Sequence, residues 1–122
     1  MKKTLERVLV VQPQEELRAY TSALLSEIGF RHVLQASSLE QASLVMENAQ
    51  SKKQVIQLVV CDDALPEGAL ALHREAKAIP CAVIADPTNP RNLRIAARLG
   101  VPSLLFRPYG KAQIERVIAA LI

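Results

Sequence analysis

The chain has 122 residues, half of them hydrophobic, and a formal net charge of +3 at pH 7. This length and apolar fraction predict one domain, residues 1–122, with a core of its own. No apolar run approaches the roughly 20 residues that span a bilayer, so we expect a cytoplasmic protein that does not contact a membrane. Nucleic-acid binders combine clustered Lys and Arg with aromatic side chains. With two Phe, two Tyr and no Trp, direct nucleic-acid binding is not expected.

Strand and helix patterns alternate along the chain. Runs of Val, Leu and Ile predict the strands, and apolar residues at helical spacing predict the helices. Gly29 is expected to end the first helix and Ser38 to cap the second. In chain order we predict strand 7–11, helix 15–28, strand 32–36, helix 39–49, strand 55–61, a helix containing 69–76, strand 80–85, helix 89–100, strand 103–106 and helix 111–121. Five βα units with short connections predict a three-layered α/β fold, a doubly wound parallel sheet with helices on both faces.

The two cysteines indicate a reducing compartment and not a disulfide framework. Cys61 falls at the end of one predicted strand and Cys81 at the start of the next, so parallel pairing is expected to hold them far apart. Both are interpreted as small core residues. The two histidines, His32 and His73, have no partners at metal-binding or catalytic spacing.

An apolar run over residues 58–61 stops abruptly at a carboxylate, Asp62. Pro66 and Gly68 then shape the loop that follows. In open α/β sheets, ligands bind just outside the carboxyl ends of the strands. The sequence therefore predicts a functional site at Asp62.

Several short features, in this order and spacing, resemble the receiver domain of two-component response regulators over nearly the full chain. They are Leu25 to Gly29, Gln35-Ala36, Asp62 with Pro66 and Gly68, Leu99-Gly100, and Arg107-Pro108-Tyr109. The resemblance implies a flavodoxin-like (βα)5 sheet of strand order 2-1-3-4-5. It also implies phosphoryl transfer from a histidine kinase to one aspartate, with Mg²⁺ as the essential cofactor.

The resemblance places the phosphoacceptor at Asp62, but the rest of the pocket departs from the family. Gln12 and Pro13 stand where the family has its metal-binding acidic pair. Ala85 stands at the Thr or Ser position, and Arg107 replaces the lysine. Mg²⁺ needs carboxylate oxygens in near-octahedral geometry, so we expect a degenerate pocket that binds no cofactor. The weak metal candidates are Asp62 and Asp86, the latter more typical of a turn before Pro87.

Three functions remain open. The leading one is a phosphorylation-independent receiver-like domain, in which Asp62 accepts a charge-assisted hydrogen bond from Arg107 and which acts as a protein-interaction or dimerisation module. The alternative is a conventional Mg²⁺-dependent receiver phosphorylated on Asp62. The third is an unrelated small-ligand binder, disfavoured because the loop over 12–15 has no glycine or hydroxyl for phosphate. No enzymatic activity is predicted.

The last third of the chain is basic on the elements by which receivers contact partners. Arg91, Arg94 and Arg98 recur at helical spacing. A contact surface would fit a signalling protein, an output domain or a second copy joined through the fourth helix, fifth strand and fifth helix. The competing interpretation is a solvated helix face. The full set of candidate interface residues is Arg91, Arg94, Arg98, Leu104, Lys111 and Arg116.

Overall fold

The computed structural model of the chain describes residues 4–62, 79–86, 88 and 104–122. Both helices predicted after the third and fourth strands fall outside these residues. The described elements are β1 (Arg7–Val11), α1 (Glu15–Ile28), β2 (His32–Ala36), α2 (Leu39–Ser51), β3 (Leu58–Asp62), β4 (Cys81–Ala85), β5 (Leu104–Phe106) and α5 (Lys111–Leu121).

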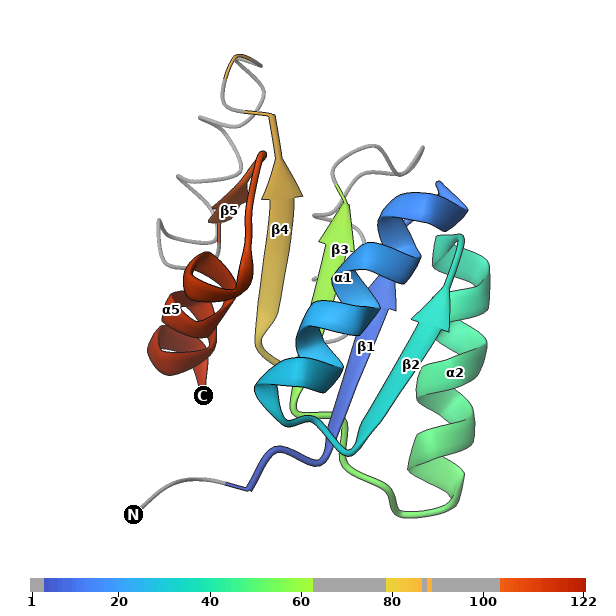
Figure 1. Ribbon diagram of the computed structural model, residues 1–122. Helices are drawn as coiled ribbons and strands as arrows, with labels where there is room; N and C mark the ends of the chain where they lie inside the picture. Colours follow the sequence, from blue (N-terminus) through green and yellow to red (C-terminus); the bar gives the residue numbers. More distant parts are fainter. Residues whose placement is uncertain (1–3, 63–78, 87, 89–103) are drawn as a thin grey trace.

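The five strands form one parallel sheet of order β2-β1-β3-β4-β5, as predicted (Figure 1). β1 lies inside the sheet, where Val8 is in register with Val33 of β2 and with Leu58 of β3. Every residue of β3 and β4 is buried. This burial explains why these strands are continuous apolar runs and do not alternate with polar residues.

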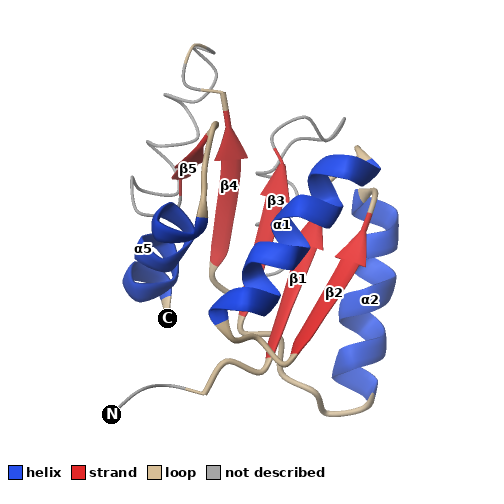
Figure 2. Cartoon of the chain, viewed as in Figure 1, coloured by secondary structure: helices blue, strands red, loops and turns tan. Residues whose placement is uncertain are grey.

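Side-chain alternation along the strands divides the core into two layers. Val8 and Val10 of β1 pack with Leu25 of α1 and Ile114 of α5 on one face. Leu9 of β1 and its neighbours pack with α2 on the opposite face. Figure 2 shows α1 and α5 on one side of the sheet and α2 on the other, which gives the three predicted layers. Among the described residues, no helix combines the length and apolar character needed to cross a membrane.

Two predicted helix signals are confirmed. Gly29 ends α1 with a φ of 132°, a conformation that residues with a Cβ rarely adopt, and its N–H donates to the Leu25 carbonyl. Ser38 caps α2 by accepting a hydrogen bond from the Gln41 N–H at 3.1 Å.

The predicted bounds of the third strand are wrong at both ends. β3 begins at Leu58, not at residue 55, because pairing with β1 begins at Val8 and Leu58. Val55 is 70% exposed and lies in the connection from α2. At the other end, Asp62 still pairs with Ile84 of β4 and belongs to the strand. The preceding helix α2 also runs two residues beyond its predicted end, to Ser51.

The expectation that the two cysteines lie far apart is also wrong. The Sγ atoms of Cys61 and Cys81 are 3.5 Å apart. Cys81 is in register with Val59, and residues two apart on a strand point to the same face. Cys61 and Cys81 are therefore diagonal neighbours on adjacent strands. Position within each strand was a poor guide because β4 starts opposite Val59, only two residues before Cys61.

Candidate functional site

The carboxyl ends of the strands bring most of the predicted pocket positions together. Asp62 is the last residue of β3, and Gln12 directly follows β1. Arg107 directly follows β5, and its backbone N–H donates to the carbonyl of Ala85, the last residue of β4. Because parallel strands end at a common edge, these four residues converge at the site expected for this class of fold.

Asp62 is buried, with 2% of its surface exposed, and each of its carboxylate oxygens receives a hydrogen bond. Arg107 donates from a terminal guanidinium nitrogen to Oδ1 at 2.5 Å. Gln12 donates from Nε2 to Oδ2 at 3.2 Å. The expected hydrogen bond between Arg107 and Asp62 is therefore present. A buried carboxylate is costly without such a partner, so the ion pair accounts for its burial.

The positions of the family's acidic pair hold no negative charge here. Gln12 is fully buried, and its Oε1 has no hydrogen-bond partner in the part of the chain that the structure describes. Pro13 is exposed and carries no polar side-chain atom. The edge is thus lined by a neutral amide, a carboxylate and a guanidinium.

Tyr109 supplies a second polar cluster beside this edge. Its hydroxyl lies 2.5 Å from Thr21 Oγ1 of α1. Thr21 donates its only hydroxyl proton to the Leu17 carbonyl, at 3.0 Å, so Tyr109 is the donor in this contact. Burial raises the pKa of the Tyr109 hydroxyl above its ordinary value of 10.0.

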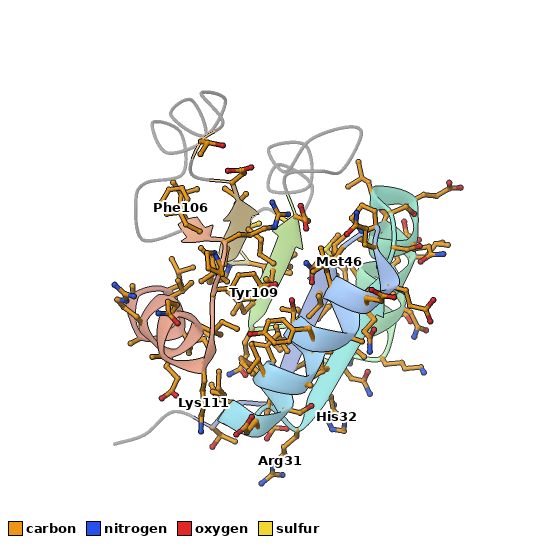
Figure 3. All side chains as sticks on the ribbon, turned by 45° about the horizontal axis from the view of Figure 1, so that its top comes forward. Arg31, His32, Met46, Phe106, Tyr109 and Lys111 are labelled. Carbon is orange, nitrogen blue, oxygen red and sulfur yellow. The ribbon has the colours of Figure 1, made fainter. Side chains whose placement is uncertain are left out.

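A second tyrosine strengthens the same junction. Tyr20 of α1 donates its hydroxyl proton to the Tyr109 carbonyl at 2.8 Å, and the two rings pack at 5.8 Å between centroids. Tyr109 lies between α5 and α1 (Figure 3). The Arg107-Pro108-Tyr109 motif was visible in the sequence, but its partners on α1 were not, since 88 residues separate Thr21 from Tyr109.

Asp86 is exposed and engaged in a local turn. Its Oδ1 accepts hydrogen bonds from the backbone N–H of Thr88 at 2.9 Å and from the Thr88 hydroxyl at 2.8 Å. The backbone hydrogen bond from Thr88 is the main reason that the pKa of Asp86 lies below its usual value. Within the described ranges, no three His, Cys, Asp or Glu side chains are grouped as metal ligands.

A groove of about 640 Å³ lies between β5 and α5. Leu104 and Arg116, two of the predicted interface residues, line it, and Lys111 is exposed at the start of α5. Phe106, which is labelled in Figure 3 and also lines the groove, is 42% exposed. Arg91, Arg94 and Arg98 lie outside the described residues. The complete lining is Leu104, Leu105, Phe106, Arg107, Pro108, Gln113, Arg116, Val117 and Ala120.

No protein-family model matches the chain, and no curated protein is similar enough in sequence to be matched to it. Solved structures do match. A receiver domain from Clostridium thermocellum is 20% identical with a TM-score of 0.76, over 96% of this chain and 94% of that one. A receiver protein from Sinorhizobium medicae is 22% identical with a TM-score of 0.75, over 96% and 94%. A chemotaxis response regulator of Vibrio cholerae is 17% identical with a TM-score of 0.73, over 98% and 100%. The chain has the fold of a response-regulator receiver domain.

Proposed function

We propose that this chain is a receiver-like signalling domain of the cytoplasm that works without phosphorylation, by presenting a protein-interaction surface. The ion pair between Asp62 and Arg107 is the observation that carries this proposal. In the receivers that the chain resembles, the corresponding aspartate accepts a phosphoryl group with the help of Mg²⁺. Here a guanidinium from the chain itself already neutralises that carboxylate.

The side chains at the carboxyl edge of the sheet do not provide the oxygen ligands that Mg²⁺ needs. This ion is hard, dehydrates reluctantly and favours carboxylate oxygens in octahedral geometry. Gln12 turns an N–H, not its oxygen, toward Asp62, and Arg107 occupies Oδ1. A metal ion at Asp62 would have to displace a buried guanidinium contact with no second carboxylate from the Gln12 and Pro13 positions. Phosphoryl transfer depends on neutralising charge on the transferred group, so the usual chemistry is strongly disfavoured.

The groove between β5 and α5 is the surface that we assign to partner binding. Its apolar lining includes Leu105, Pro108 and Val117, and Arg116 is also a lining residue. Such a surface fits an apolar segment flanked by Asp or Glu, presented by a signalling protein or an output domain. In the homodimer form of the same proposal, the partner is a second copy of the chain, joined through β5 and α5.

Acetyl phosphate with Mg²⁺ tests the first half of the proposal. We expect the intact mass of the purified chain to show no phosphoryl adduct. The matched control is the variant Gln12→Asp, Pro13→Asp, Ala85→Thr and Arg107→Lys, which restores the donors of the family's pocket and is expected to gain an adduct at Asp62. A stable adduct on the unmodified chain that Asp62→Asn removes would establish the conventional Mg²⁺-dependent receiver instead.

Self-association tests the second half. Sedimentation velocity on the unmodified chain measures any dimer, and Arg116→Glu reverses the charge of an exposed α5 residue that lines the groove. We expect Arg116→Glu to weaken the association about tenfold or more, and Lys52→Glu, an exposed change at the end of α2, to leave it unchanged. Asp62→Asn is also expected to leave it unchanged, because the proposed surface does not depend on phosphorylation. Equal effects of Arg116→Glu and Lys52→Glu would exclude the groove as the interface.

A further inference from the structure

The two cysteines form a buried thiol pair that plays no part in the proposed function. Their Sγ atoms are 3.5 Å apart, and both side chains are at most 3% exposed. Both lie in the core layer on the α2 face of the sheet. Cys61 directly precedes Asp62 in β3. The pair therefore bridges β3 and β4, with Cys61 one residue before the pocket and Cys81 at the amino end of β4.

We propose that Cys61 and Cys81 are a redox modification site that forms a reversible intramolecular disulfide. A peroxide is the oxidant class that suits a buried pair, because hydrogen peroxide is nearly as small as water. One thiol gives up its proton and attacks a peroxide oxygen as the thiolate; the O–O bond breaks, a sulfenic acid forms, and the released hydroxide takes up that proton to give water. The second thiol then attacks that sulfur, forms the S–S bond and releases a second water. The two thiols lose two electrons in total, and the peroxide gains them.

The short distance between the two sulfur atoms favours an intramolecular bond over other products. A disulfide needs sulfur atoms about 2.05 Å apart, so the pair must close by about 1.5 Å. Cys81 pairs with Val59, and the bridge must therefore run diagonally across the two strands. A bridge that draws two strands together in this way is strained, and strained disulfides are the ones that reduce readily. The proximity of the sulfur atoms thus favours formation of the bridge, and its strain favours reduction.

The cross-link would act on the pocket through the backbone. It would tie β3 to β4 one residue before Asp62, closing a loop between positions 20 residues apart. Fixing these strands should reduce their local opening. We expect slower amide hydrogen exchange at 59–62 and 81–85 in the oxidised protein than in the reduced protein.

Peptide mapping tests the proposal directly. The folded chain is treated with hydrogen peroxide, its remaining thiols are blocked with N-ethylmaleimide in denaturant, and it is digested with trypsin. Cleavage after Lys53, Arg74, Lys77 and Arg91 separates the cysteines into peptides 54–74 and 78–91. We expect these peptides to be joined, no covalent dimer on a non-reducing gel, a folded chain by circular dichroism, and release of both peptides by dithiothreitol.

Cys81→Ala is the matched control, and it should leave Cys61 as a peroxide-modified or blocked thiol with no linked peptide. Two blocked thiols after peroxide treatment of the unmodified chain would overturn the proposal. Sulfinic acid on one cysteine alone, or a disulfide only between chains, would overturn it as well. None of these readouts depends on phosphorylation or on a partner, so the result is independent of the proposed function.

Discussion

Asp62 is held at the edge of the sheet by donors from two other strand ends, and the guanidinium of Arg107 provides the compensating charge. Arg107→Met keeps much of the side-chain length but removes that charge. Breaking one side of a buried ion pair leaves the other charge uncompensated. We expect Arg107→Met to lower the free energy of unfolding by about 2 kcal/mol, less than for a fully buried pair because the Arg107 side chain is 30% exposed.

Urea unfolding measures this loss, with Arg107→Lys as the charge-conserving control. Lysine keeps one positive charge, so its loss should be smaller than that of methionine. An unfolding free energy of Arg107→Met equal to that of the unmodified chain would show that the pair contributes no stability.

Tyr109 links pH to stability. Burial raises the pKa of its hydroxyl in the folded state, and the hydrogen bond with Thr21 opposes this shift only in part. The stability contributed by this neutral hydroxyl is fully present below about pH 10, the pKa of an unfolded tyrosine, and is lost as the pH rises through the folded pKa. We expect Tyr109→Phe to cost about 1 kcal/mol at neutral pH.

The cost of Tyr109→Phe should stay constant up to about pH 10 and shrink as the pH rises above that value. Urea unfolding of both proteins on both sides of this pH gives the difference, in which the titration of the lysines cancels. A cost that stays constant above this pH as well would mean that the hydroxyl is not protected by the fold.

The sequence predicted Asp62 and Arg107 as partners because both positions follow from where strands end. Parallel strands share an edge, so residues at their carboxyl ends meet whatever their separation in the chain. The contact of Tyr109 with Thr21 depends on how α1 is rotated against the sheet. Such rotation is set by packing and leaves no signal in local patterns, so this contact could not be predicted.

At the scale of elements, β1, α1, β2 and α5 have the bounds predicted from apolar spacing, Gly29 and strand-forming residues. The start of β3 was wrong because Val55 and Ile56 favour extended structure in any context. Lys53, at a φ of 56°, lies in the connection that follows α2. Where a strand begins or ends thus depends on its pairing with the neighbouring strand. The β propensity of single residues does not contain this information.

The cap of α2 supports a prediction at this scale. Ser38 satisfies the N–H of Gln41, which otherwise has no partner within the first turn of the helix. Ser38→Ala should therefore lower the free energy of unfolding by about 1 kcal/mol. Ser26→Ala, on the exposed face of α1, is the matched control and should change stability by less than about 0.5 kcal/mol in thermal or urea unfolding. Equal effects of the two changes would contradict the assigned cap.

For the whole molecule, we expect Mg²⁺ to have no specific effect on stability. A ligand that binds only the folded state stabilises it by an amount that grows with the logarithm of the ratio of its concentration to the dissociation constant, and this raises the melting temperature. Millimolar Mg²⁺ should therefore leave the melting temperature where NaCl of equal ionic strength leaves it. NMR titration should likewise show no saturable shift of the Gln12 or Asp62 amides. A stabilisation that appears with Mg²⁺ and disappears in Asp62→Asn would reveal a metal site.

The order of strands has a consequence for synthesis on the ribosome. Residues 4–62 contain β1, β2 and β3, which pair only with one another until β4 arrives. During translation this first half emerges with Asp62 at an open edge and with its cation still 45 residues away in the chain. Until Arg107 emerges, the carboxylate has the Gln12 amide and water as partners but not the guanidinium that compensates its charge. Translation therefore completes the pocket late, and a chain that stops before β4 keeps the edge of β3 open for non-native pairing.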